Sequence, residues 1–359
     1  MSIPTITGVE AQTITTPRLT TRILFAGPED GQPVLFLHGN SSSATWWEEA
    51  MVTLPDGFRA IAPDQRGFGD ADPTKKIDAT RGVGDLADDM IALLDTLGLD
   101  KVHVVGSSMG GSVVWRLLME HPNRWLTVTQ VSPGSPYGFA GTKDIDGTPC
   151  YSDFAGSGGG LINPQVVELV KRGDLDPDNP FTMRSALRRL VCKPPFIPER
   201  EEDILASCLS LHIGEQDWPG DKTASPNWPF TAPGVWGAAN ALSPKYADDP
   251  TRLYVIDPKP AILWLRGSHD LAVSDQAASD PGTLGAAGLI PGWPGMDVYP
   301  PQPMLGQTRA VLDHYAAAGG VYQEVVIDAG HAPYLDNLEA FNHYLHLRLQ
   351  TAEPLIEVA

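Results

Sequence analysis

The chain has 359 residues, long for one domain and short for two large ones, and 42% of them are hydrophobic, so a disordered or fibrous class is excluded. Its net charge of −19 comes from only 25 Lys and Arg against 44 Asp and Glu. This scarcity of bases argues against nucleic acid and against an anionic membrane surface as partners.

The first third of the chain alternates between two hydrophobic periods. Short apolar runs bounded by polar residues or glycine predict buried strands of a parallel sheet. Apolar residues at i, i+3 and i+4 between them predict helices with one buried face. This alternation indicates a parallel α/β sheet with right-handed crossovers. The predicted strands are 33–37, 58–62, 102–105 and 125–131, and the predicted helices are 83–97 and 109–121.

The alternating pattern is lost after residue 133 and returns near residue 261. It then predicts a strand at 261–266, a helix at 303–318, a strand at 322–327 and a helix at 338–350. Of the 33 prolines, 23 lie between residues 133 and 303, a region that is under half of the chain.

Two inserted segments account for that region. Residues 134–258 contain three helix-like pieces (164–172, 182–191 and 198–213) and many aromatic residues. Residues 273–302 are rich in proline and glycine, and we expect them to form a functional loop or lid without regular structure. We therefore divide the chain into a core of residues 1–133 and 259–359, interrupted by a cap domain at 134–258.

Cysteine usage and the N-terminal residues bear on the compartment. Cys150, Cys192 and Cys208 are too few and too scattered for a disulfide framework or a zinc knuckle. The first residues show no signal-peptide pattern, and no run of about 18 apolar residues is present. We expect a soluble, cytoplasmic protein that does not bind membranes.

The strongest local signal is a glycine-flanked serine, Ser108, between the strand 102–105 and the following helix. The pattern G-x-S-x-G at such a junction is typical of a nucleophile elbow, a strained turn where Gly106 and Gly110 avoid steric clashes. Free backbone N–H groups at the helix start, among them that of Met109, favour an oxyanion. Ser108 is therefore the predicted nucleophile.

A serine nucleophile needs a base, and the base needs an acid that orients it. Asp270 follows the strand 261–266, and His331 follows the strand 322–327. Both residues therefore lie at the carboxyl edge of the sheet, where Ser108 also lies. Asp275 and Asp328 are the alternatives to Asp270.

A second oxyanion donor is expected beside Ser108. Gly39 allows a tight turn after the strand 33–37, and the N–H of Asn40 is the natural donor together with that of Met109. Trp46 and Trp47 follow, and they either line the site or pack against the sheet.

These features together resemble the α/β-hydrolase superfamily. They occur in order as the His38-Gly39 turn, the Asp64–Gly69 segment, the elbow at Ser108, an inserted cap, Asp270 and His331. The resemblance implies an α/β fold with an eight-stranded, mostly parallel sheet, a Ser108–His331–Asp270 triad, an oxyanion hole at Asn40 and Met109, and no metal or organic cofactor.

The elbow separates branches of that superfamily. Haloalkane dehalogenases and epoxide hydrolases carry aspartate as the nucleophile, and Ser108 excludes their chemistry. The elbow is similar to that of carbon–carbon hydrolases of meta-cleavage products and to that of simple esterases, whereas the turn at Asn40 departs from the glycine-rich turn of the former.

We therefore expect a serine hydrolase of ester or lactone bonds, acting on a medium-sized, rather apolar small molecule, as a monomer or a homodimer. A carbon–carbon hydrolase with the same triad and a ligand-binding receptor on the same fold are the alternatives. Aromatic residues of the cap suggest an apolar pocket roof. The predicted substrate-binding residues are Trp46, Trp47, Trp218, Trp228 and Trp236.

Overall fold

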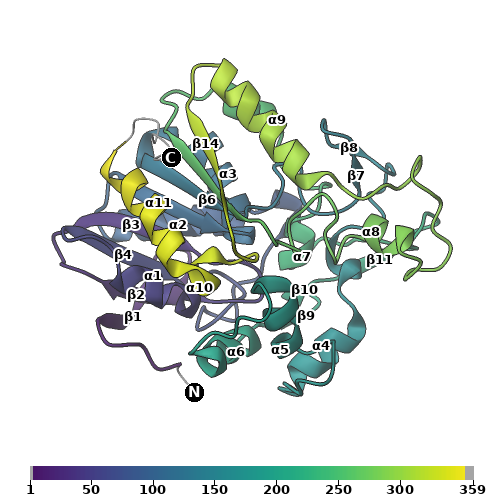
Figure 1. Cartoon of the computed structure of the whole chain (residues 1–359), viewed down its shortest axis with the longest axis horizontal. Coiled ribbons are helices and arrows are strands. Elements are labelled where there is room, and N and C mark those ends of the chain that lie inside the picture. The colour runs from purple at the N-terminus through teal and green to yellow at the C-terminus, as the bar shows by residue number, and fades with distance from the viewer. Residues whose placement is uncertain (1–2, 352–359) are drawn as a thin grey trace.

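The computed structural model describes residues 3–351 and has an eight-stranded sheet at its centre (Figure 1). The strand order is β1-β2-β4-β3-β5-β6-β13-β14, in which β1 pairs with β2 and β2 with β4 in antiparallel fashion. The remaining pairs, from β4 across to β14, are parallel. The predicted eight-stranded, mostly parallel sheet is therefore confirmed. Its strands are β1 (Val9–Thr15), β2 (Thr20–Ala26), β3 (Gln32–Leu37), β4 (Phe58–Pro63), β5 (Val102–Ser107), β6 (Trp125–Val131), β13 (Ile262–Gly267) and β14 (Tyr322–Ile327).

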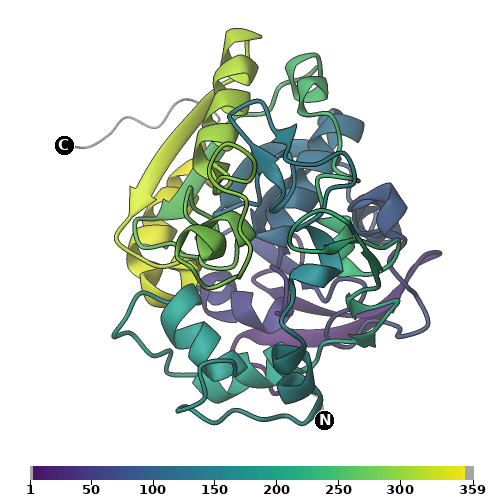
Figure 2. The same cartoon turned by 90° about the vertical axis from the view of Figure 1, so that its right-hand side faces the viewer.

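Helices cover both faces of this sheet, because the parallel strands are apolar on both sides. Figure 2 shows the C-terminal helices on one side and the helices of residues 84–120 on the other. Helix α2 buries the apolar stripe predicted at 83–97, and the closing helix buries Phe341 and Leu345. The helices of the core are α1 (Glu48–Val52), α2 (Gly84–Thr96), α3 (Met109–Glu120), α9 (Met304–Ala317), α10 (Pro333–Asp336) and α11 (Leu338–Gln350).

The segment between β6 and β13 consists of short elements. Its longer helices lie together beyond the carboxyl edge of the sheet, at the lower right of Figure 1. Three two-stranded ribbons accompany them. The helices are α4 (Pro164–Lys171), α5 (Met183–Ala186), a π-helical turn (Leu187–Val191), α6 (Glu201–Leu209) and α7 (Ala238–Ala241), and the ribbons are β7 (Thr142–Lys143) with β8 (Thr148–Pro149), β9 (Ile213–Gly214) with β10 (Trp218–Pro219), and β11 (Lys222–Ala224) with β12 (Thr231–Pro233).

Three local features differ from the sequence prediction. Strands β1 and β2 form an antiparallel pair at the start of the chain, where no strand was predicted. The piece 198–213 is helical only over Glu201–Leu209. The excursion 273–302 contains one short helix, α8 (Pro281–Ala286), which begins where the Asp280 side chain accepts the Thr283 N–H.

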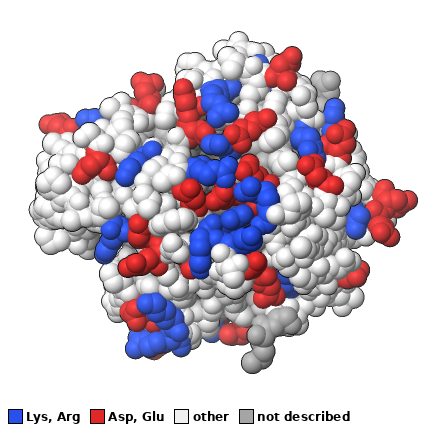
Figure 3. Space-filling view, turned by 180° about the vertical axis from the view of Figure 1, so that it is seen from behind, with Lys and Arg blue, Asp and Glu red and all other residues white. Residues whose placement is uncertain are grey.

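Charged side chains of both signs occupy the face opposite to that of Figure 1. Figure 3 shows Lys and Arg near the middle of this face with Asp and Glu directly beside them. Ion pairs also occur beneath the surface, where the guanidinium of the buried Arg66 lies 2.7 Å from a carboxylate oxygen of Asp89. Among residues 3–351, no helix is both long and apolar enough to cross a membrane.

Candidate active site

Ser108 occupies a strained turn between β5 and α3. Its backbone has φ 54° and ψ −116°, a left-handed region that residues with a Cβ rarely adopt. Its N–H donates to the carbonyl of Val131 at 3.0 Å, and its carbonyl accepts the N–H of Gly134 at 3.2 Å. Hydrogen bonds to β6 and to the chain that follows it therefore hold the turn in place.

The flanking glycines are required by close backbone approach. A Cβ on Gly106 would lie 2.6 Å from the carbonyl oxygen of Gly110, and a Cβ on Gly110 would overlap the carbonyl oxygen of Leu37. The glycine spacing read in the sequence thus has the steric cause inferred for it. Gly39 also lies against the turn, since its Cβ would be 3.1 Å from that of Ser108.

His331 and Asp270 meet although 61 residues separate them. The Nδ1 atom of His331 lies 2.9 Å from Oδ2 of Asp270, and both residues are buried. The other carboxylate oxygen of Asp270 accepts the N–H groups of Ala272 at 2.8 Å and Val273 at 2.9 Å. These two bonds fix the carboxylate plane, so that Oδ2 faces the imidazole.

The rival aspartates have other partners. Asp275 accepts the N–H of Leu305 at 2.8 Å near the start of α9. Asp328 is exposed and forms ion pairs with Lys193 and His269. Asp270 is therefore the carboxylate that contacts His331.

The turn that carries Asn40 is held from within the core by a buried neutral histidine. The Nε2 atom of His38 accepts the Gln65 N–H at 3.0 Å, which places the proton on Nδ1, where it is donated to the Gly39 carbonyl at 2.8 Å. Burial lowers the pKa of His38 to about 4. The imidazole is thus neutral, and it anchors the Asn40 backbone beside Ser108.

A cavity of about 250 Å³, which we call the inner cavity, brings four predicted site residues together. Asn40, Ser108, Met109 and His331 line it, with Asp270 behind the imidazole. The rest of its wall is mainly aliphatic. Ser112, one helical turn after the elbow, also lines it and was not predicted, although its i+4 spacing from Ser108 places it on the same face of α3.

A second cavity of about 500 Å³, the outer cavity, adjoins the inner one. The residues that line both cavities are Asn40, Leu161, Ile162, Ala186, Leu190, Val191 and Ser279. Among the predicted tryptophans, Trp46 and Trp218 line the outer cavity.

The other three tryptophans lie outside the lining of both cavities, which differs from the sequence prediction. Trp47 is fully buried and stacks on Tyr334 with 3.9 Å between ring centroids. Trp228 packs edge-on against Tyr299, and Trp236 donates its backbone N–H to Asp221. The rings of Trp47 and Trp228 therefore pack against other aromatic rings, and aliphatic side chains form most of the wall of the inner cavity.

One inserted segment contacts both the cavities and the histidine loop. The carbonyl of Val191, at the end of the π-helical turn, accepts the His331 N–H at 2.7 Å. Oδ2 of the half-buried Asp336 accepts the N–H groups of Gly330 and of Lys193, each at 2.7 Å. Burial raises the pKa of Asp336. Sequence reasoning missed Asp336 because Lys193 lies 143 positions away, and because the contact to Gly330 is made by a backbone N–H that no motif marks.

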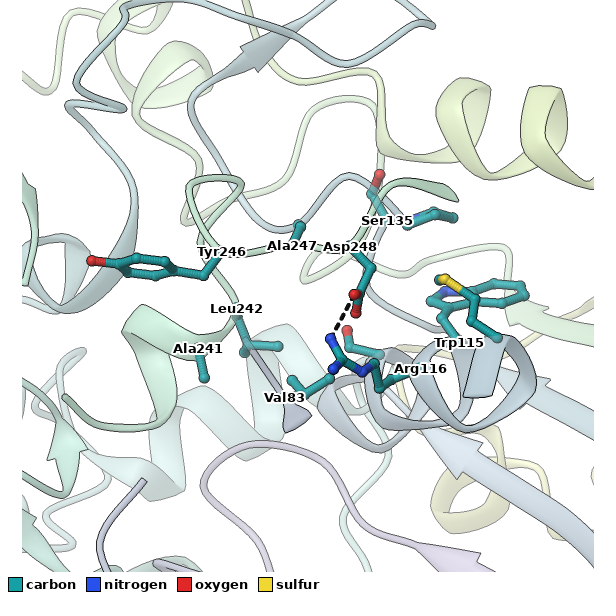
Figure 4. Close-up of a pocket in the computed structure, with 13 residues that line it drawn as sticks. Val83, Trp115, Arg116, Ser135, Ala241, Leu242, Tyr246, Ala247 and Asp248 are labelled. Carbon is teal, nitrogen blue, oxygen red and sulfur yellow. Dashed lines mark hydrogen bonds and ion pairs between the residues drawn. The ribbon is translucent and has the colours of Figure 1, made fainter. Parts of the chain in front are cut away.

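A third hollow lies on the far side of the inner wall. It has a volume of about 30 Å³, room for about one water molecule. Figure 4 shows it crossed by the ion pair of Arg116 and Asp248, 2.5 Å apart, which joins α3 to the segment after α7. It is too small for a substrate and serves as part of the packing.

Comparison with known proteins agrees with this geometry. Residues 32–147 match the family described as alpha/beta hydrolase fold. An AB hydrolase superfamily protein of Bacillus subtilis is 37% identical over 116 residues, 32% of this chain and 40% of the relative. An epoxide hydrolase of Siraitia grosvenorii is 34% identical over 34% of this chain and 39% of its own length. A 2-hydroxy-6-oxo-6-phenylhexa-2,4-dienoate hydrolase of Burkholderia cepacia is 30% identical over 39% of this chain and 43% of its own length.

Similarity of structure extends further than similarity of sequence. A crystal structure of a carboxylesterase from Bacillus subtilis covers 95% of this chain and 91% of its own, with a TM-score of 0.57 at 19% identity. The chain therefore has the α/β-hydrolase fold, and the relatives that match part of it are named as hydrolases. It spans only about two fifths of the curated relatives that it matches.

Proposed function

We propose that the protein is a serine hydrolase that cleaves an ester or lactone of a small molecule through an acyl-enzyme at Ser108. The observation that carries the proposal is the inner cavity, which Ser108 and His331 both line while Asp270 bonds the far nitrogen of the imidazole. This is the arrangement of nucleophile, base and orienting acid that acyl transfer needs.

The reaction proceeds in two half-reactions. Ser108 Oγ attacks the carbonyl carbon while Nε2 of His331 takes its proton, and the N–H groups of Asn40 and Met109 bind the oxyanion. His331 then protonates the leaving alcohol as the carbon–oxygen bond breaks. Water attacks the acyl-enzyme, again losing a proton to His331, and the acid and free Ser108 are released. Asp270 holds the imidazole with its proton on Nδ1 and stabilises the imidazolium.

We further propose that residues 134–258 act as a cap over this site. The segment contributes cavity walls through Leu161-Ile162 and through the π-helical turn. The excursion 273–302 completes the wall with Val273 and Ser279.

A fluorophosphonate tests the nucleophile directly. The wild-type protein should be labelled at Ser108 and should hydrolyse 4-nitrophenyl acetate, whereas Ser108→Ala should do neither. Ser112→Ala is the matched control, because Ser112 lines the same cavity one turn away. Labelling that persists in Ser108→Ala would contradict the proposal.

Carbon–carbon hydrolysis is the second candidate, favoured by the similarity to the dienoate hydrolase. It would use the same triad. Turnover of a meta-cleavage dienoate faster than that of any simple ester would decide for it. Retention of the product with turnover far below one per minute would instead favour a ligand-binding receptor.

A further inference from the structure

The outer cavity is twice as large as the inner one and touches neither Ser108 nor His331. It adjoins the inner cavity along Leu161, Ile162, Ala186 and Leu190, which line both. A substrate whose reacting carbonyl lies at Ser108 can therefore extend one arm across this shared wall. The far end of the cavity reaches Phe181, which is 41% exposed and marks the side that faces solvent.

No residue that lines the outer cavity, within the described part of the chain, carries a formal charge at neutral pH. In the inner cavity, within the described part of the chain, His331 is the one lining residue of the Asp, Glu, His, Lys and Arg types. Three arginines lie next to lining residues in the sequence without lining the cavity themselves: Arg184 and Arg188 pair with Glu201, and Arg189 is exposed. A buried carboxylate without a cation is strongly penalised, so a charged arm is excluded by the wall itself.

Two tryptophans contribute to the wall of the outer cavity. Trp46 is 7% exposed and Trp218 is 2% exposed, and both line this cavity. The indole nitrogen of each is closed to solvent. A ligand in the cavity therefore contacts their apolar ring surface and not the N–H groups.

We infer that the outer cavity binds the longer arm of the substrate, and that this arm is apolar and uncharged. The inference rests on the proposed ester hydrolysis at Ser108 and names its substrate class. It also separates this protein from enzymes of carboxylate-bearing dienoates, because such substrates bring an anion that neither cavity wall compensates.

Three 4-nitrophenyl esters of equal chain length test the class of the arm. They are the 8-methoxyoctanoate, the decanoate and the monoester of decanedioic acid, with the acetate as reference, and acetates of the matching long alcohols form a parallel series. We expect kcat/KM for the methoxy ester to exceed that for the carboxylate by at least about 100-fold in the series that the enzyme prefers. Equal values for the two, or no gain over short esters in either series, would overturn the inference.

Two alanines in the 273–302 excursion form a matched pair of variants. Ala278 lines the outer cavity, whereas Ala286 is exposed and lines neither cavity. Ala278→Phe should lower kcat/KM for the long methoxy ester at least about tenfold and leave that for the acetate within about threefold, and Ala286→Phe should leave both unchanged. Equal losses on both substrates in Ala278→Phe would place the arm elsewhere.

Adding a charge to the wall should change selectivity. Val166→Arg puts a cation in the outer wall and should raise kcat/KM for the carboxylate ester relative to the methoxy ester at least about tenfold. An unchanged ratio of the two esters in Val166→Arg would refute the exclusion of a charged arm by the wall.

Binding without catalysis separates this inference from the proposed function. In Ser108→Ala, methyl 8-methoxyoctanoate should change the fluorescence of Trp46 and Trp218, and 8-methoxyoctanoic acid at pH 8 should not. If the wild type is neither labelled nor active but this binding preference holds, the proposed hydrolysis fails and the cavity assignment stands. If the esters are hydrolysed and the acid binds as well as the methyl ester, the cavity assignment alone fails.

Discussion

Replacing Asp270 by asparagine should reverse the tautomer of His331 while leaving the fold intact. Oδ1 of Asp270 accepts two backbone N–H groups, from Ala272 and Val273. If an asparagine turned its NH₂ group toward these two N–H groups, neither would have an acceptor, and each lost hydrogen bond would cost about 1–3 kcal/mol of stability. The amide oxygen therefore stays there, and the NH₂ faces Nδ1 of His331 across 2.9 Å.

That orientation forces Nδ1 to accept a hydrogen bond, so the proton of the neutral imidazole moves to Nε2. The nitrogen that has to take the Ser108 proton is then already protonated. Loss of the correct tautomer in a serine triad lowers kcat about 10,000-fold, which corresponds to about 5 kcal/mol of transition-state stabilisation.

The assay is kcat on 4-nitrophenyl acetate together with the melting temperature. Asp270→Asn should melt close to the wild type and lose nearly all activity. Asp275→Asn is the matched control, since Asp275 contacts the backbone at α9 and should keep its activity. A kcat for Asp270→Asn within tenfold of the wild type, with an unchanged melting temperature, would refute the reasoning.

Three further predictions concern other parts of the fold. Asp336→Ala leaves the backbone N–H groups of Gly330 and Lys193 without their acceptor. It should lower the unfolding free energy by about 1–3 kcal/mol in a denaturant titration and lower kcat at least about tenfold. An unchanged kcat would show that His331 does not depend on the Asp336 hydrogen bonds. Gly110→Ala should prevent folding to the active state. The control Gly98→Ala, at a positive φ with nothing within 4 Å of the added Cβ, should lower the unfolding free energy by only about 1 kcal/mol. A Gly110→Ala protein that circular dichroism shows to be stably folded would contradict the steric account of the elbow. Burial raises the pKa of Asp280 from 3.8 to about 6, so the folded state binds the proton more tightly and Asp280 destabilises the fold increasingly as the pH rises through this range. The stability of Asp280→Asn relative to the wild type should therefore improve between pH 4 and pH 8, by at most about 3 kcal/mol. A stability difference that does not depend on pH would refute this.

Much of the core could be predicted from the sequence because its causes are local. The period of apolar residues identified six of the eight strands, and the register β3–β5 brings Leu37 beside Gly106 as a parallel sheet requires. The glycine pattern around Ser108 follows from the space that a tight strand-to-helix turn leaves, and the placement of Asp270 and His331 after strands follows from where parallel strands end.

The walls of the cavities were decided only by the tertiary structure. Aromatic residues of the inserted segment were expected to line a pocket, yet Trp228 packs edge-on against Tyr299, and aliphatic residues such as Leu161 and Leu190 form much of the wall. Which face of a short helix points to a cavity depends on contacts across the whole chain, and neither the composition nor the period of a four-residue helix encodes it.

The amino-acid sequence by itself thus determined the sheet, the strained turn at Ser108 and the edge where its partners lie, because each follows from sterics and periodicity within a few residues. The tertiary structure decided that Asp270, and neither Asp275 nor Asp328, contacts His331, that Asp336 ties the histidine loop to the inserted segment, and that two adjoining cavities have uncharged walls. These features join residues tens to hundreds of positions apart, and such pairings exist only once the chain has folded.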